Sequence, residues 1–385
     1  MKQLIGFFLV ALSLVSCLGR TARGQEDGDT LRLKYSSLLT IVRHDRFTEV
    51  SIRNPWKEGR TLHTYILVPG DEADGNGETA LRGTSQEPAL PQGTVIRTPV
   101  RRAAVFTTMH CALLEALGHA DDIVAVADLE YIKIPYLHQR AAQGKVADCG
   151  NGMNPVVEKI MDVKPAIVML SPFENSGGYG KLEDIGIPLV ECAEYMESSP
   201  LARAEWMKFY GMLFGEEHKT DSLFAVVDSS YHALCRQARE AGRGCSLLVD
   251  KLVGSVWYVP GGRSTIGQMV KDAGGNYPWA ADDHSGSLPL TFESVLERGG
   301  DTDVWLFRYS SDHTLTWREL QAEHHGYKQL RPFRQHMVYG CNVEQTLFYE
   351  ETPFRPNLLL SDFLQILHPD MTPRQPLRYF TPLHE

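Results

Sequence analysis

The chain has 385 residues, of which 43% are apolar and 22% are charged. This composition is typical of a globular protein that can bury a sizeable core in two or three domains. The formal charge of −10 at pH 7 makes a partner with a phosphate backbone unfavourable, so we expect no nucleic-acid binding.

The first residues predict an export signal with a lipidation site. An apolar run from Leu4 to Val15 follows one lysine and is shorter than the roughly 20 residues that a spanning helix needs. Ser16 and Cys17 then have the spacing of a bacterial lipoprotein signal. We expect removal of residues 1–16, acylation of Cys17, and a mature protein in the periplasm or cell envelope, anchored to a membrane by lipid. An ordinary cleaved signal is the alternative.

Residues 17–93 predict a flexible tether followed by a β-rich extension. Segments rich in β-branched and aromatic residues cover 35–41, 48–52 and 62–68, with turn-like residues between them. Residues 71–93 are rich in Gly, Glu, Asp and Pro, which is typical of an exposed loop. We therefore expect an antiparallel β extension before the main fold.

After the extension, the pattern predicts an α/β lobe. Short apolar runs alternate with helix-period stretches, which is typical of parallel strands covered by helices. A helix through 111–117 can be capped by Gly118, and Asn154-Pro155 is typical of the start of another helix. We place this lobe at 94–216.

A long helical stretch follows, with apolar residues spaced three and four apart over 217–241. At about 1.5 Å per residue it is long enough to cross from one small domain to another, although a surface helix on one lobe is the alternative. The α/β pattern then restarts over 242–385. Residues 154–158 and 290–295 each precede an apolar strand, which suggests two similar lobes flanking a linker helix.

The chemistry-bearing residues do not form a known catalytic motif. The six cysteines after Cys17 lack C-x-x-C spacing, and no metalloprotease, phosphate-loop or nucleophile-elbow pattern occurs. Disulfides are possible in an exported protein, but we expect most of these cysteines to be buried free thiols. We predict that the protein is not an enzyme and has no resident cofactor and no metal bound by its own side chains.

Ligand contacts are expected in the loops at the carboxyl ends of the predicted strands, where open α/β sheets bind ligands. Aromatic residues there suit a large, partly apolar ligand, and Arg or His can orient it. For each aromatic taken singly, packing in the core is an equal alternative. The candidate ligand-binding residues are Tyr131, Phe173, Trp257, Tyr258, Arg263, Trp279, His284, Arg308 and Tyr309.

Together these patterns resemble the solute-binding proteins of ABC importers for cobalamin, haem and ferric siderophores. The similarity covers about Thr94 to Pro369, and the β extension lies outside it. The stretches that carry it are 102–128, 152–168, 199–206, 260–275 and 355–369.

The resemblance implies an α/β fold of two Rossmann-like lobes joined by one long α-helix, with the ligand in the cleft between them. It also implies an ABC permease and its ATPase as partners, with one acidic residue on each lobe pairing with permease arginines. The matching positions are Glu174 or Glu197 on the first lobe and, less closely, Asp312 on the second. We expect a monomer.

The resulting hypothesis is a lipid-anchored receptor that captures a metal chelate for an importer. Cobalamin and a ferric siderophore stay open as ligands, with haem third. The first alternative is an envelope enzyme with a metal cofactor in the cleft, for which Cys111, Cys149 and His110 are the candidate ligands. The second is a sensor or adhesion lipoprotein without a transporter.

Overall fold

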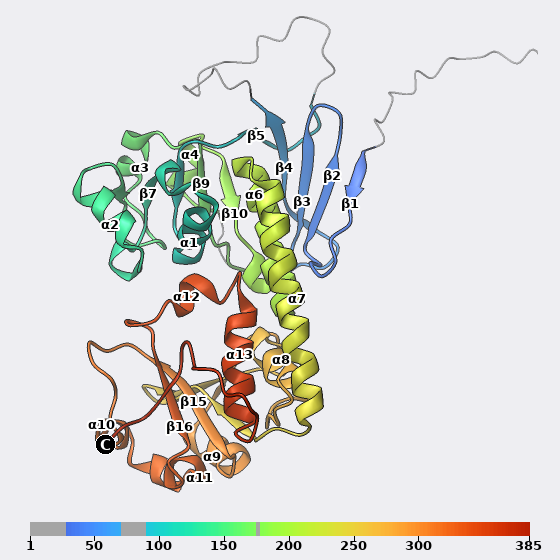
Figure 1. Ribbon diagram of the computed structural model, residues 1–385. Coiled ribbons are helices and arrows are strands. Elements are labelled where there is room, and N and C mark those ends of the chain that lie inside the picture. Colours follow the sequence, from blue (N-terminus) through green and yellow to red (C-terminus); the bar gives the residue numbers. More distant parts are fainter. Residues whose placement is uncertain (1–27, 71–89, 175–177) are drawn as a thin grey trace, which may run out of the picture.

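The computed structural model describes residues 28–70, 90–174 and 178–385. Two α/β lobes lie at the two ends of a long helix, α7 (Glu217–Ala241), with an additional β-sheet beside the first lobe (Figure 1). This is the fold class expected from the sequence. The predicted signal segment, Cys17 and most of the loop predicted over 71–93 lie outside the described residues.

The β extension is a five-stranded sheet that continues past the expected boundary at residue 94. The first four strands are antiparallel, and the fifth pairs parallel to the fourth. Its strands, in spatial order, are β1 (Asp29–Leu31), β2 (Leu39–Arg43), β3 (Thr48–Arg53), β4 (Thr61–Pro69) and β5 (Thr94–Thr98). Residues 94–98, which the sequence pattern places in the first lobe, therefore belong to the extension.

This sheet shares a hydrophobic core with the first lobe. Ile41, Val50 and Tyr65 are fully buried in the same core cluster as Trp206 and Phe209. Alternate residues of a strand face opposite sides of a sheet, so one face of β2, β3 and β4 is apolar and packs on the lobe. The extension is consequently part of the folded lobe and not an appendage.

The first lobe has a parallel sheet in the order β10-β9-β6-β7-β8, the doubly wound arrangement of a Rossmann-like fold. Its strands are β6 (Ala103–Val105), β7 (Ile123–Val126), β8 (Ala147–Asp148), β9 (Ile167–Leu170) and β10 (Leu189–Glu191). Its helices are α1 (Thr108–Leu117), α2 (Pro135–Ala142), α3 (Val157–Val163), α4 (Lys181–Asp184), α5 (Pro200–Glu205) and α6 (Met207–Phe214).

Of two predicted helix boundaries in this lobe, the end of α1 at Gly118 is confirmed and the start of α3 lies later than predicted. Gly118 ends α1 with φ of 88°, a left-handed cap that glycine adopts without steric cost. The helix predicted to start at Asn154-Pro155 begins later, at Val157, with Val156 as its extended N-cap residue. The motif before it forms a turn in which Asn151 accepts a hydrogen bond from the Met153 N–H at 2.9 Å.

Helix α7 connects the lobes, as expected from its length. It packs on α6 of the first lobe and on α13 (Pro356–Leu367) of the second. Phe224, Val227 and Tyr231 form its buried stripe, at the spacing of one helix face. The single helix therefore belongs to both lobes and limits how far they can separate.

The second lobe contains two sheets. The larger one has the order β11-β15-β16-β17, and the smaller antiparallel one has the order β12-β13-β14. The strands are β11 (Leu247–Val249), β12 (Leu252–Val253), β13 (Val256–Pro260), β14 (Ser287–Leu290), β15 (Val304–Tyr309), β16 (Val338–Asn342) and β17 (Thr381–Pro382). The other helices are α8 (Thr265–Asp272), α9 (Phe292–Gly299), α10 (Trp317–Glu323), α11 (Arg331–Arg334) and α12 (Phe348–Glu351).

Four 3₁₀ turns complete the secondary structure of the described residues: Ala120–Asp122, Leu129–Tyr131, Glu194–Met196 and His325–Gln329. The six cysteines in this part of the chain are unpaired, and all but Cys245 are buried. Among the residues that the structure describes, no helix combines the length and the apolar character needed to span a bilayer.

Candidate functional site

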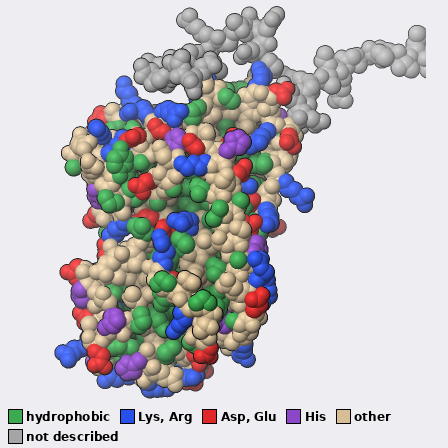
Figure 2. Space-filling model, in the orientation of Figure 1, with side chains coloured by type: hydrophobic (Ala, Val, Ile, Leu, Met, Phe, Trp, Pro, Cys, Tyr) green, Lys and Arg blue, Asp and Glu red, His purple; other side chains and the backbone are tan. Residues whose placement is uncertain are grey.

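A cleft of about 580 Å³ lies between the lobes and is lined by residues from both. The first lobe contributes Phe106 to Met109 and Tyr131, and the second contributes Ser264 to Ile266 and Arg308. On the face shown in Figure 2, hydrophobic side chains and basic side chains occur together where the lobes meet. The volume is within the range of about 300–1,000 Å³ that small-molecule sites occupy.

The first wall of the cleft follows β6, where the chain turns into α1. Thr107 is the extended residue before the helix, and its hydroxyl is hydrogen-bonded to Nδ1 of the buried His110. Thr108 donates from Oγ1 to Glu350 Oε1 at 2.9 Å. The strand-to-helix turn thus presents Thr107 to the cleft and uses Thr108 to contact the second lobe.

Two aspartates occupy corresponding places in the two lobes. Asp128 follows β7 and Asp250 follows β11, both line the cleft, and both have positive φ, of 50° and 62°. Aspartate is one of the few residues that tolerate this region. Asp128 Oδ2 accepts the Gly152 N–H at 3.0 Å, and Asp250 holds Arg308 in a bidentate contact at 2.9–3.1 Å.

The charges that line the cleft nearly balance. Among its described lining residues, the negative charges of Asp128 and Asp250 offset the positive charges of Arg203 and Arg308. Arg308 is neutralised by Asp250, whereas Arg203 has a buried Nε without a hydrogen-bond partner. Burial lowers the pKa of Arg203, and the nearby Glu194 partly opposes this effect. The cleft therefore suits a ligand with little net charge and at most a local negative group.

The apolar part of the lining is aromatic. Phe106 and Tyr131 lie on the first lobe, and Phe348 and Tyr349 lie on α12 of the second. Tyr131 and Tyr349 are 59% and 46% exposed. Exposed rings on both walls can each bury a large surface when a ligand enters the cleft.

Helix α12 belongs to the second lobe, contacts the first lobe at the rim of the cleft, and lies between the two lobes in Figure 1. Its Glu350 is 5% exposed and accepts the Thr108 hydroxyl and the Lys133 N–H, the latter at 3.2 Å. The Lys133 ammonium is also paired with Glu344. These contacts, together with α7, define the separation of the walls.

Of the candidate ligand-binding residues, the structure brings Tyr131 and Arg308 to the cleft. It places Trp257, Trp279 and Tyr309 in the core of the second lobe, at 0%, 2% and 8% exposure, which corrects the prediction for these three.

The physical reason differs among the three. Trp257 lies on β13, the central strand of the smaller antiparallel sheet, and its indole N–H donates to Val249 O at 2.9 Å. Trp279 packs beside Tyr277. Tyr309 follows Arg308 on the same strand and so faces the opposite side of the sheet.

The other four candidates are exposed but do not line the cleft. Phe173 and Tyr258 are 42% and 47% exposed. Arg263 has an exposed side chain, and His284 lies on the surface beside Asp282, with its Nδ1 at 3.1 Å from Asp282 Oδ1. The neighbouring Ser285 to Ser287 line the cleft in place of His284.

The candidate docking residues have different environments. Glu197 is 3% exposed, and its carboxylate accepts hydrogen bonds from the Ser37 and Leu38 N–H groups and from the Trp206 indole. It holds the β extension against the lobe, so its assignment to the docking surface was wrong. Glu174 is exposed and remains a candidate.

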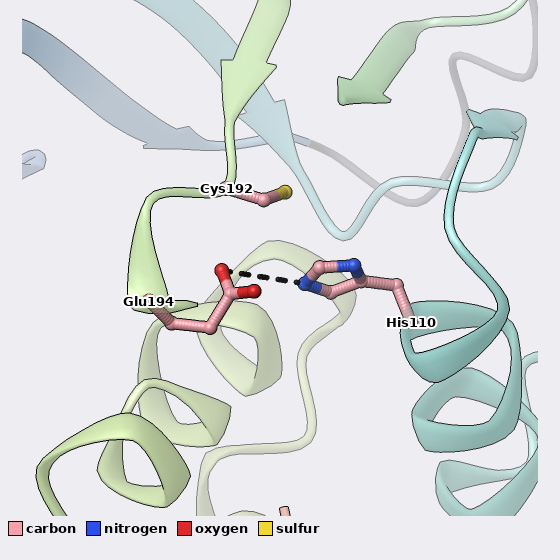
Figure 3. Close-up of side chains that lie close together, drawn as sticks. All are labelled: His110, Cys192 and Glu194. Carbon is pink, nitrogen blue, oxygen red and sulfur yellow. Dashed lines mark ion pairs between the residues drawn. The ribbon is translucent and has the colours of Figure 1, made fainter. Parts of the chain in front are cut away.

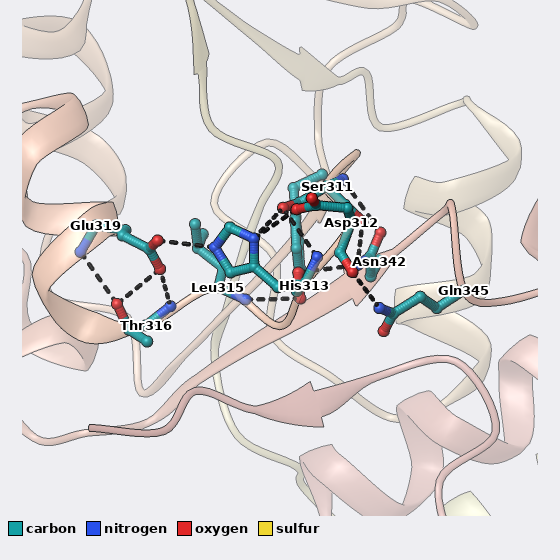
Figure 4. A network of polar contacts seen from close by, with 9 residues as sticks. Ser311, Asp312, His313, Leu315, Thr316, Glu319, Asn342 and Gln345 are labelled. Atoms are coloured by element: carbon teal, nitrogen blue, oxygen red, sulfur yellow. Dashed lines mark hydrogen bonds and ion pairs between the residues drawn. The ribbon is translucent and has the colours of Figure 1, made fainter.

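Asp312 is also exposed and belongs to the network shown in Figure 4. Its carboxylate contacts His313 Nδ1 at 2.7 Å, and His313 Nε2 contacts Glu319 at 2.8 Å. Hydrogen bonds that His313 donates to the Asp312 and Glu319 carboxylates raise the pKa of His313. Because the side chain of Asp312 is 96% exposed, it stays available to a partner.

The residues considered for a metal cofactor do not converge on the cleft. The Cys111 thiol contacts Val105 O, and Cys149 is buried in a small separate cluster of the first lobe. His110 is fully buried behind Thr107. Burial lowers the pKa of His110 to about 3, with Arg203 adding to the effect.

The residues that the sequence reasoning missed are Asp128, Asp250, Arg203 and the aromatics of α12. The two aspartates carried a usable signal, because Asp250 comes one residue and Asp128 two residues after the end of a short apolar strand. Arg203 and α12 gave no such signal in the sequence, because neither lies at the end of a strand and both reach the cleft through helix packing.

Comparisons with known proteins agree with the two-lobe fold described above. Two uncharacterised lipoproteins of Methanocaldococcus jannaschii are 23% and 22% identical to this chain over 364 and 327 residues, covering 90% and 82% of it and 84% and 80% of their own lengths. A solved periplasmic haem-binding protein from Pseudomonas aeruginosa has a TM-score of 0.58 at 13% identity, covering 74% of this chain and 99% of its own.

A solved protein described as an ABC-type Fe³⁺-hydroxamate transport system from Saccharomonospora viridis has a TM-score of 0.54 at 19% identity, covering 70% of this chain and 93% of its own. At these identities the solved structures establish the shared fold alone. The family model described as periplasmic binding protein matches residues 104–343, more than half of the 385-residue chain. The chain therefore belongs to the periplasmic binding protein family.

Proposed function

We propose that this protein is the receptor of an ABC importer and that it binds a metal chelate in the cleft between its lobes. The observation that carries the proposal is the cleft of about 580 Å³, with aromatic rings on both walls and a single helix as linker. Similar solved proteins are described as haem-binding or as part of Fe³⁺-hydroxamate transport, which supports a ligand of this chemical class.

The charges of the cleft favour a chelate of low net charge. A strongly anionic ferric siderophore needs several unpaired cations, and the two arginines among the described lining residues are Arg308, which is paired with Asp250, and Arg203. A ferric hydroxamate or cobalamin suits the balanced walls better. Haem needs a side chain that reaches the iron, for which Tyr131 and Tyr349 are the candidates in the cleft.

Delivery to the importer is proposed to use the exposed carboxylates Glu174 and Asp312. Acidic side chains on both lobes attract a basic permease surface and steer the encounter, an effect that salt weakens. The proposal also includes a monomer, an ATPase that drives the permease, and a lipid on Cys17 that keeps the receptor at the membrane. Replacement of Cys17 by alanine should release the protein from membranes.

The test is a calorimetric titration of the purified full-length protein with a ferric hydroxamate, cobalamin and haem. We expect saturable binding of one ligand per chain for at least one of the three. Failure of all three to bind folded protein would overturn the chelate-receptor proposal. Tryptophan fluorescence is a poor readout here, since no tryptophan is among the described residues that line the cleft.

A further inference from the structure

Three side chains of types that bind metal ions converge inside the first lobe (Figure 3). They are His110 from α1, Cys192 directly after β10, and Glu194 from the next 3₁₀ turn. The imidazole nitrogen, the thiol sulfur and a carboxylate oxygen all lie within 4.8 Å of one another. The three residues are 0%, 0% and 1% exposed, so they are not a chance cluster of surface groups.

Two polar atoms of this cluster lack partners, whereas the Cys192 thiol donates to Val190 O at 3.5 Å. His110 Nε2 and Glu194 Oε1 are buried without a hydrogen bond, and His110 Nε2 is 3.7 Å from Glu194 Oε2, beyond hydrogen-bond distance. A buried polar atom without a partner destabilises the fold, so two of them in one cluster call for a ligand. Burial also raises the pKa of the Glu194 carboxyl to about 7.

The remaining atoms of the same side chains are held in place. Nδ1 of His110 is hydrogen-bonded to Thr107, and Glu194 Oε2 accepts the Tyr210 hydroxyl at 2.7 Å. The Tyr210 ring also packs edge-on against His110, with 4.6 Å between the ring centres. A histidine whose second nitrogen is fixed in this way, and a carboxylate with one oxygen anchored, are typical of metal ligands with their supporting shell.

The charges of the three ligands match a divalent ion. A thiolate and a carboxylate together carry −2, and the imidazole binds as a neutral ligand, so a bound divalent cation leaves no net charge in the cluster. Arg203 is the nearby cation that opposes binding, and it lies at the cleft. The mixed nitrogen, sulfur and oxygen set suits Zn²⁺ and similar ions and excludes Mg²⁺ and Ca²⁺, which require oxygen ligands.

We propose that His110, Cys192 and Glu194 form a site for a divalent transition-metal ion of the zinc type. The site is distinct from the chelate-binding cleft, and it departs from our expectation that the protein's own side chains bind no metal. Binding releases to solvent the Cys192 thiol proton and the proton of any Glu194 carboxyl that is protonated. Three protein ligands leave one position for water. Thr107 lines the cleft and touches His110, so one residue separates the site from the wall of the cleft.

The test uses the full-length protein, stripped of metal with a chelator and titrated with Co²⁺. We expect one Co²⁺ per chain, visible d–d bands, and a thiolate-to-cobalt charge-transfer band in the near ultraviolet. Zn²⁺ should displace Co²⁺ and abolish these bands. Absence of the charge-transfer band at saturation would overturn the proposal, and so would absence of any binding to the folded protein. Neither result depends on whether the cleft binds a chelate.

Variants locate the ion within the lobe. Cys192→Ser should remove the charge-transfer band and weaken Zn²⁺ binding by about 100-fold or more, since changes to the supporting shell alone cost about 10- to 100-fold. Cys111→Ala is the matched control, because Cys111 is equally buried and follows His110 but does not belong to the cluster of three converging side chains. An unchanged spectrum in Cys192→Ser, or its loss in Cys111→Ala, would contradict the assignment. The wild-type Co²⁺ spectrum remains decisive if a variant folds poorly.

Discussion

Replacement of Glu197 by glutamine tests whether this residue is a structural anchor or part of a docking surface. In the structure its two carboxylate oxygens accept hydrogen bonds from the backbone and hydroxyl groups of residues 36–38 and from the Trp206 indole, at 2.6–3.1 Å. An amide keeps one acceptor oxygen but points N–H donors at groups that are themselves donors. The segment between β1 and β2 then loses its attachment to the first lobe.

The magnitude follows from the hydrogen bonds that glutamine cannot accept. A hydrogen bond to a charged group contributes about 1.5–3 kcal/mol, and the amide nitrogen forfeits one or two of those made to Glu197 outright. We therefore expect Glu197→Gln to lower the free energy of unfolding by about 2–4 kcal/mol. The measurement is urea unfolding of the full-length protein, followed by circular dichroism.

The control is Asp312→Asn, at a side chain that is 96% exposed. Surface changes of this kind usually stay within about 0.5 kcal/mol. The reasoning is refuted if Glu197→Gln leaves the unfolding midpoint unchanged. It is also refuted if the variant keeps wild-type stability but loses affinity for the permease, because that would return Glu197 to the docking surface.

Tyr131→Ala should weaken chelate binding by about 2- to 10-fold in calorimetry, because about 0.5–1.5 kcal/mol of ring contact is lost. Tyr258→Ala removes an exposed ring outside the cleft and should leave the affinity unchanged. Glu350→Gln removes the charged acceptor that joins the lobes, so the rate of ligand dissociation measured by stopped flow should rise about tenfold. An unchanged rate would show that α7 alone sets how far the two lobes open. In an NMR titration, His313 should have a pKa above 6.5, and Glu319→Gln should lower it; equal midpoints would contradict the contact in Figure 4. Because its folded pKa is raised, the contribution of His313 to stability is present below pH 6.5 and is lost as pH rises through that pKa.

The main architecture could be predicted because it depends on local periodicity. The 25-residue helix α7 has the limits expected from the sequence, since its apolar stripe repeats without interruption. The boundary of the β extension could not be found in this way. Strand β5 pairs with β4 across residues 71–89, and nothing in a local pattern shows which of two sheets a strand will join.

The cleft was predictable only in part, for a related reason. The rule that ligands bind at the carboxyl ends of parallel strands applies to β6, β7, β11 and β15. It fails for Trp257, whose strand is antiparallel and belongs to the smaller sheet. The cluster of His110, Cys192 and Glu194 could not be found in the sequence. His110 is 82 positions before Cys192, and the two meet only because α1 packs on the loop after β10.

The core shared by the β extension and the first lobe restricts how the chain can be divided. A fragment cut at residues 104–343, the limits of the family match, would begin inside β6 and would lack the strands that cover Trp206 and Phe209. It would also lack α13, on which α7 packs. We expect such a fragment to aggregate on expression. A chimera that exchanges the first lobe with that of a relative needs residues 29–98 as well, because the sheet and the lobe share one core.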